Sequence, residues 1–109
     1  MTFEEYQKES LKTALYPNRG ENFIYPTLGL AGESGEVAEK IKKVLRDKGG
    51  IIDETTKEEI KKELGDVLWY VSQLATELNL SLDEIAEVNL KKLLSRLERG
   101  VISGNGDNR

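Results

Sequence analysis

Two acidic segments of the same pattern lie in neighbouring parts of this chain, each within a stretch of helical periodicity. The first is ESGEV at residues 33–37 and the second is ELGDV at residues 63–67. At about 100° per residue, positions i and i+3 of a helix lie side by side on one face. Each segment therefore predicts a helix with two carboxylates on a single face.

On a helical wheel, these carboxylates share the face that apolar residues occupy. Glu33 falls inside the apolar arc of the first helix and Glu36 at its edge, and Glu63 and Asp66 take the same two places in the second helix. The residues that define the two arcs are Leu30, Val37, Ile41 and Val44 in the first helix, and Ile60, Val67, Leu74 and Leu78 in the second. The pattern predicts that both acidic pairs point toward a contact between the helices.

Burying carboxylates in this way costs several kcal/mol for each unpaired charge, and close carboxylates also repel one another. They must be protonated, paired with Lys40, Lys61 or Lys62, or bound to metal. Carboxylate oxygens are the ligands that Mg²⁺ and Mn²⁺ prefer, and the two matching pairs favour metal over a solvated acidic face. Gly35 and Gly65 each cost about 1 kcal/mol in a helix interior, so we expect a helix or ligand to approach them closely.

The remaining periodicity predicts an all-α fold with four main helices. Alternation typical of strands is absent, and the short connection between the last two helices favours antiparallel, bundle-like packing. Residues 1–100 are expected to form a single domain, followed by a flexible tail at 101–109. The expected helices run from a Thr2 cap to about Tyr16, from Thr27 to Lys48, from a cap at Thr55 or Thr56 to about Leu78, and from a Ser81 cap to about Arg99.

Composition excludes several kinds of function. The net charge of −4 argues against sequence-independent binding of nucleic acid, because such binding depends on lysine and arginine side chains that face phosphates. The chain has no cysteine and no histidine, so catalytic triads built on histidine are excluded. No apolar window is long enough to span a membrane and no signal peptide is present, so we expect a cytoplasmic protein. A chain of 109 residues has a small core, which favours oligomerisation.

The spacing of the four acids can be compared with the signatures of known protein families. Glu33-Ser-Gly-Glu36, twenty-six intervening residues and Glu63-Leu-Gly-Asp66 resemble the E-x-x-E…E-x-x-D signature of the MazG-like nucleotide pyrophosphohydrolases, in the all-α NTP pyrophosphatase superfamily. The similarity extends from TALYPNRGENF to VNLKKLLSR. The resemblance implies that the chain is a hydrolase that cleaves a nucleoside triphosphate or deoxynucleoside triphosphate between the α and β phosphates, giving the monophosphate and pyrophosphate.

By this resemblance, Glu33, Glu36, Glu63 and Asp66 would bind Mg²⁺, with Mn²⁺ as a possible substitute. A metal lowers the pKa of a bound water, so neither histidine nor a covalent nucleophile is needed. We assign the role of proton acceptor to Glu36, because it lies nearer the rim of the apolar arc than Glu33. The resemblance also implies a homodimer or homotetramer with substrate pockets near the subunit contacts.

Substrate contacts are predicted on the last helix, where Asn89, Lys92 and Arg96 follow one another at steps of three and four. Asn89 borders the apolar arc and is expected to face inward, and similar enzymes use an Asn and a Lys here. The alternative for Lys92 and Arg96 is a solvated basic face near the end of a helix. Tyr70, one turn after Asp66, is predicted to touch sugar or base, or else to be a core tyrosine. Trp69 is interpreted as a residue for subunit contact or base stacking.

Two other functions fit parts of the pattern. One is a narrower relative, either a dCTP- or dUTP-selective pyrophosphatase or a phosphoribosyl-ATP pyrophosphohydrolase, since the same four acids serve all of these. The other is a non-catalytic helical oligomerisation module. The presence of all four acids disfavours the second, because a degenerate cluster would have lost at least one of them.

Overall fold

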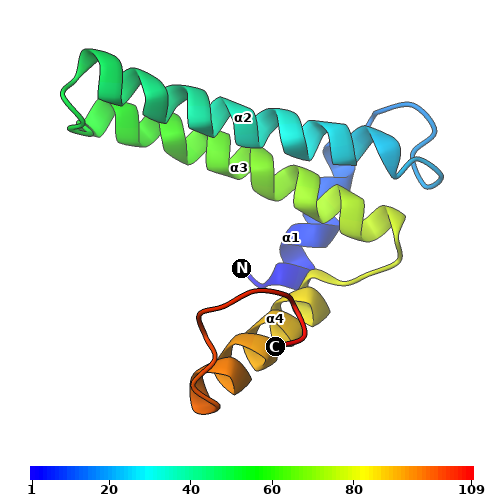
Figure 1. Ribbon diagram of the computed structural model, residues 1–109. Coiled ribbons are helices and arrows are strands. Elements are labelled where there is room, and N and C mark those ends of the chain that lie inside the picture. Colours follow the sequence, from blue (N-terminus) through cyan, green and yellow to red (C-terminus); the bar gives the residue numbers. More distant parts are fainter.

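The computed structural model describes residues 1–109, which form four α-helices, one short 3₁₀ turn and no strand (Figure 1). The prediction of an all-α fold is confirmed. None of these helices combines the length and apolarity that a membrane span requires. The elements are α1 (Phe3–Ser10), η1 (Leu11–Thr13), α2 (Ile24–Asp47), α3 (Glu54–Glu77) and α4 (Leu82–Glu98).

Two helices of 24 residues each, α2 and α3, form a long antiparallel hairpin (Figure 1). Gly49 and Gly50 end α2 with φ angles of 59° and 79°, a left-handed conformation that glycine adopts at little cost. Asp53 caps α3 by accepting a hydrogen bond of 2.8 Å from the Thr56 backbone N–H. The predicted caps at Thr55 and Thr56 are therefore wrong. The helix starts earlier because the Asp53 carboxylate is itself a strong capping group.

The start of α2 also differs from its prediction. The helix begins at Ile24 rather than Thr27, so residues 24–26 are not part of the preceding loop. Pro26 lies in the first turn, where its missing N–H removes no hydrogen bond of the helix. The Asn22 side chain accepts a bond of 3.0 Å from the Tyr25 N–H, which satisfies one of the free donors of that turn.

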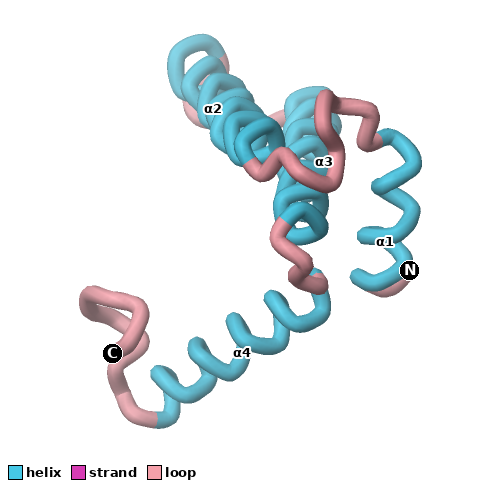
Figure 2. Tube along the Cα trace, turned by 90° about the vertical axis from the view of Figure 1, so that its right-hand side faces the viewer, coloured by secondary structure: helices cyan, strands magenta, loops and turns pink.

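The short helix α1 lies beside the C-terminal half of α3 (Figure 2). The two helices share a buried polar contact. The Ser10 hydroxyl is 3.0 Å from that of Ser72 and accepts a bond of 2.8 Å from the Gln73 amide. Ser72 and Gln73 are fully buried. This contact uses one side of α3, while α2 covers another.

The last helix, α4, does not pack antiparallel on α3 as predicted. It contacts α1 and extends away from the α2–α3 hairpin (Figures 1 and 2). Asn79 takes a left-handed φ of 57°, and the Leu80 N–H bonds back to the Ala75 carbonyl, which turns the chain sharply after α3. Since α1 and α2 already cover α3, the turn directs α4 elsewhere. The predicted Ser81 cap of α4 is confirmed by its bond to the Glu84 N–H.

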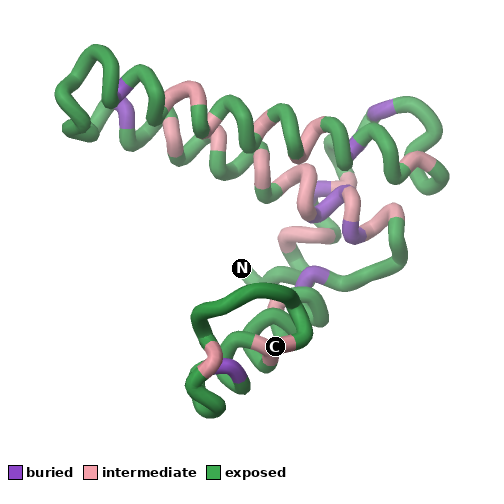
Figure 3. Tube along the Cα trace, in the orientation of Figure 1, coloured by how far each residue is buried: buried purple, intermediate pink, exposed green.

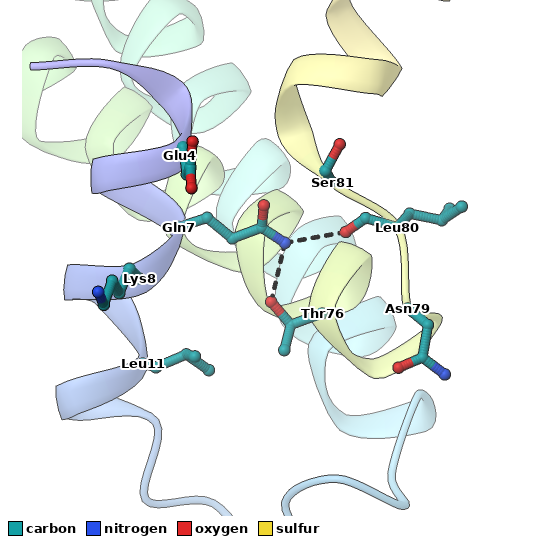
Figure 4. Close-up of a pocket in the computed structure, with 8 residues that line it drawn as sticks. All are labelled: Glu4, Gln7, Lys8, Leu11, Thr76, Asn79, Leu80 and Ser81. Carbon is teal, nitrogen blue, oxygen red and sulfur yellow. Dashed lines mark hydrogen bonds between the residues drawn. The ribbon is translucent and has the colours of Figure 1, made fainter.

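The Gln7 side chain of α1 holds this turn in place (Figure 4). Its amide nitrogen donates to the Thr76 hydroxyl at 3.0 Å and to the Leu80 carbonyl at 2.9 Å, and its oxygen accepts from the Leu82 N–H at 3.0 Å. These bonds join α1, the end of α3 and the start of α4. The groove around them has a volume of about 580 Å³.

Most residues of a single copy of the chain are exposed (green in Figure 3), and many of them are large and apolar. Only 11 of 109 residues are buried. The radius of gyration is 16.8 Å, compared with about 13 Å for a compact domain of this length. Exposed large apolar residues include Leu64 and Leu68 on α3 and Leu90, Leu93, Leu94 and Leu97 on α4. The fold therefore presents extended apolar faces on both sides of the α3–α4 turn.

We predict that Gln7→Ala lowers the free energy of unfolding by about 1–3 kcal/mol, because it removes three hydrogen bonds that join three helices. Urea denaturation followed by circular dichroism measures the change. Lys8→Ala, at an exposed neighbouring position whose side chain forms no hydrogen bond or ion pair, is the control and should stay within about 0.5 kcal/mol of wild type. Equal effects of the two variants would contradict the role given to Gln7.

Candidate active site

Three of the predicted acids meet where α2 and α3 run side by side. Glu33 comes from α2, and Glu63 and Asp66 come from successive turns of α3. One carboxylate oxygen from each lies within 4.8 Å of the other two. Glu33 and Glu63 are half-buried and Asp66 is exposed. The antiparallel pairing of the two helices thus creates an acidic cluster that is open to solvent on one side.

Glu36, the fourth predicted acid, lies outside this cluster. Its side chain is exposed on α2, one turn after Glu33. Its negative charge nevertheless acts on Glu33 and contributes to raising the pKa of that carboxyl. Glu36 therefore lies at the rim of the acidic cluster, not within it.

The cluster carries repulsion that no basic side chain relieves. Burial raises the pKa of the Glu33 carboxyl, and the charges of Asp66, Glu63 and Glu36 raise it further. Of the three lysines that the sequence offered as partners, Lys62 forms no ion pair and the other two are paired with other acids. Lys40 lies 3.6 Å from Glu59, and Lys61 lies 3.3 Å from Glu58. The interpretation of the cluster as a set of lysine ion pairs is therefore wrong for these two lysines.

For the glycines near the cluster, the predicted close approach of a neighbouring helix of this chain is wrong, and that of a ligand stays a prediction. A Cβ atom added at Gly35 or Gly65 would meet nothing within 4 Å, so no part of this chain approaches them closely. The close approach occurs at Gly29 instead, where an added Cβ would overlap the ring of Tyr70. The absence of a side chain at Gly29 allows the Tyr70 ring to pack closely against α2.

A row of tyrosine rings leads away from the acidic cluster. Tyr70 lies beside it, since burial, Tyr25 and the charges of Glu33 and Asp66 raise the pKa of the Tyr70 hydroxyl. The Tyr25 ring lies 6.4 Å from Tyr70 and stacks on Tyr16 at 4.9 Å between ring centroids.

Tyr6 reaches the same region from α1. Burial and then the charge of Asp66 raise the pKa of its hydroxyl. Sequence spacing does not reveal that the charge of Asp66 acts on Tyr6, because Tyr6 belongs to a helix far from both acidic segments in the chain.

Trp69 makes its polar contact within the chain. Its indole nitrogen donates a bond of 2.9 Å to the Thr13 hydroxyl, and its ring meets Tyr70 edge-on at 5.0 Å. Neither predicted role, base stacking or subunit contact, is needed to explain it. The indole joins the turn after α1 to α3 and supports the Tyr70 ring from one side.

Comparison with known proteins identifies the family of the chain. A family model described as the MazG nucleotide pyrophosphohydrolase domain matches residues 26–101, which include all four acids and α4. The chain belongs to the MazG family. It is also 48% identical over 114 residues to the Gene 37 protein of Mycobacterium phage L5, with all of both chains covered. No solved structure matches the chain.

In this MazG chain, the predicted substrate residues of α4 lie apart from the acidic cluster, because α4 extends away from the hairpin (Figures 1 and 2). Asn89 is exposed in a single copy, as are Leu93 and Leu97 of the arc that it borders, so its predicted inward orientation stays a prediction. Asn89 and Lys92 line a shallow groove with Leu80, Glu84, Ile85 and Val88.

Arg96 is buried beneath residues 101–109, where its guanidinium donates to the Gly106 and Asp107 carbonyls. Of the predicted substrate residues, only Tyr70 lies beside the cluster within one chain.

We predict that Gly29→Ala destabilises this MazG chain by about 1–3 kcal/mol, although alanine favours helix, because the new methyl displaces the Tyr70 ring. Gly32→Ala is the matched control. It lies in the same helix, and a Cβ there meets nothing within 4 Å, so it should stabilise by up to about 1 kcal/mol. Thermal unfolding of both variants measures the difference, and a gain in stability at both positions would contradict the packing of Tyr70.

We also predict a pH-dependent gain in stability for Glu33→Gln. The folded pKa of Glu33 is raised above its ordinary 4.5. Ionisation of Glu33 therefore lowers the free energy of unfolding. This loss of stability is absent below about pH 4, where the carboxyl is protonated, and complete above the raised pKa. In metal-free buffer the variant should be more stable than wild type at about pH 7 and equal to it at about pH 4.

Urea denaturation at the two pH values, with a chelator present, measures this gain. Glu87→Gln is the control, because Glu87 is exposed on α4 and forms no ion pair. A gain of the same size at both pH values would show that ionisation of Glu33 is not its cause.

Proposed function

We propose that this protein is a Mg²⁺-dependent nucleoside triphosphate pyrophosphohydrolase, which hydrolyses the bond between the α and β phosphates of an NTP or dNTP. The observation that carries the proposal is the cluster of Glu33, Glu63 and Asp66, whose oxygens lie within 4.8 Å of one another. Membership of the MazG family supports the same reaction class. Free nucleotides as substrates accord with a cytoplasmic protein.

The chemistry of the cluster fits a hard divalent cation. Its donors are carboxylate oxygens from two helices, the ligand type that Mg²⁺ and Mn²⁺ prefer. Burial first, and then the charges of Asp66, Glu63 and Glu36, raise the pKa of Glu33, and a cation would neutralise those charges. Glu33, Glu63 and Asp66 would hold the metal, with Glu36 at its rim. When bound, Mg²⁺ would screen the triphosphate charge and lower the pKa of a coordinated water.

Glu36 is the proposed proton acceptor. It is exposed at the rim of the cluster and forms no ion pair, so its carboxylate is accessible to a water molecule next to the substrate. A carboxylate in this position can take the proton that the attacking water loses. Tyr70 is proposed to hold the sugar or base, because its ring packs against Gly29 of α2, one turn before Glu33, and is supported by Tyr25 and Trp69.

We further propose that the active unit is a homodimer or homotetramer. The exposed apolar faces of α3 and α4 would be buried against a second copy of the chain. Such an assembly provides a route by which Asn89, Lys92 and Arg96 of one copy reach the phosphates bound by the acidic cluster of another.

Incubation with Mg²⁺ and a panel of NTPs and dNTPs tests the reaction. We expect pyrophosphate and monophosphate, with activity lost when EDTA removes the metal. Glu36→Gln and Glu63→Gln should each lower kcat by at least about a hundredfold without unfolding the chain, while Glu87→Gln, on the exposed face of α4, retains activity. Orthophosphate and diphosphate as products, or no turnover by a folded protein, would contradict the proposal. The second result would favour the non-catalytic oligomerisation module.

Light scattering coupled to gel filtration tests the assembly. We expect a mass of twice or four times the 12.3 kDa of one chain. Leu90→Glu places a charge on the exposed apolar face of α4 and should shift the protein toward monomer, whereas Lys91→Glu on the polar face should not. A wild-type protein that runs as a monomer at micromolar concentration would contradict the oligomer.

A further inference from the structure

Residues 101–109, here called the strap, fold back along α4 instead of leaving the molecule (Figure 1). The reversal starts at Gly100, whose φ of 71° is left-handed. The Gly100 N–H bonds to the Leu97 carbonyl and the Val101 N–H to the Arg96 carbonyl, the pair of bonds that ends many helices on a glycine. The end of α4 therefore sets the direction in which the strap returns.

The strap is closed by two arginines. The Arg109 guanidinium donates to the carbonyls of Val101, Ile102 and Gly106, which holds the strap as a ring. The Arg109 carbonyl in turn accepts a bond of 2.7 Å from Arg99 of α4. These bonds keep residues 106 and 107 over one flank of the helix.

On that flank the strap covers Lys92 and Arg96. The Asp107 carboxylate lies 3.2 Å from the Lys92 ammonium and 3.6 Å from the Arg96 guanidinium. Arg96 is only 4% exposed, and its Nε is buried without a hydrogen-bond partner. The Asp107 side chain is 85% exposed, so the acid is held by the two cations and not by burial. Its pKa is lowered by Lys92 first and also by Arg96.

Lys92 and Arg96 have the chemistry of an anion-binding site, and the anion that they hold is the Asp107 carboxylate of the same chain. Two cations one turn apart face a single carboxylate, as they would face a phosphate oxygen. The unpaired Nε shows that the strap does not satisfy the whole guanidinium, although arginine pairs best with two oxygens at once. A phosphate group, with more charge and more acceptor oxygens, would satisfy these donors better than Asp107 does.

We propose that the strap is an intramolecular competitor for the phosphate site formed by Lys92 and Arg96, with Asp107 in the place of a nucleotide phosphate. This inference rests on the proposed function, in which these two residues bind substrate phosphates. Displacement of the strap opens the site, so the strap weakens nucleotide binding and leaves the chemistry at the acidic cluster unchanged. Exposed ion pairs contribute little each, so the expected effect on affinity is about two- to fivefold.

Steady-state kinetics test the strap with Asp107→Asn and with a chain that ends at Gly100. Both should lower KM for the nucleotide by about two- to fivefold with kcat unchanged, and the difference from wild type should shrink at high salt. Glu98→Gln is the matched control, because it removes one negative charge from the same end of α4 without contacting Lys92 or Arg96. An unchanged or raised KM in Asp107→Asn would overturn the proposal, whether or not the shortened chain folds.

A second measurement separates the strap from the proposed enzyme activity. Titration calorimetry with inorganic pyrophosphate in metal-free buffer should show tighter binding to Asp107→Asn than to wild type or Glu98→Gln. Lys92→Gln should abolish this gain. If wild type has no turnover, the proposed function fails while this titration still decides the strap. Absence of pyrophosphate binding by every variant, or equal binding by wild type and Asp107→Asn, would overturn the anion site.

Discussion

Mutual repulsion among Glu33, Glu63 and Asp66 at the contact between α2 and α3 is the constraint on which the site depends. The hairpin is the most extensive helix pairing of the chain, and it brings these carboxylates together where lysines do not neutralise them. Such an arrangement lowers stability unless a cation binds. The hairpin is thus less stable than it would be without these acids. Binding of a divalent cation would neutralise their charges and stabilise it.

The rings around the cluster show how the hairpin shapes the space next to it. Gly29 lets Tyr70 lie against α2, and Trp69 and Tyr25 support that ring from other directions. The rings come from α2 and α3, and the Thr13 hydroxyl after α1 orients the indole. The aromatic surface therefore depends on the same packing that assembles the acids, and a change in either alters both.

The Gln7 contact has a consequence far from the acidic cluster. By fixing the turn between α3 and α4, it directs α4 away from the hairpin and leaves apolar faces uncovered. The same direction separates Lys92 and Arg96 from the acids of the cluster. Within one copy these two residues pair with Asp107 of the strap instead. The proposed oligomer and the proposed competition by the strap both follow from where α4 points.

The sequence by itself determined the all-α class, the four acids, the Ser81 cap and the acidic pair on each helix, because helical periodicity and capping act over only a few residues. It did not reveal Tyr6 beside Asp66, the close approach at Gly29 or the course of α4. Those features depend on contacts between residues far apart in the chain, such as Gln7 with Leu82. Only the tertiary structure decided them, since local patterns carry no information on which helix faces meet.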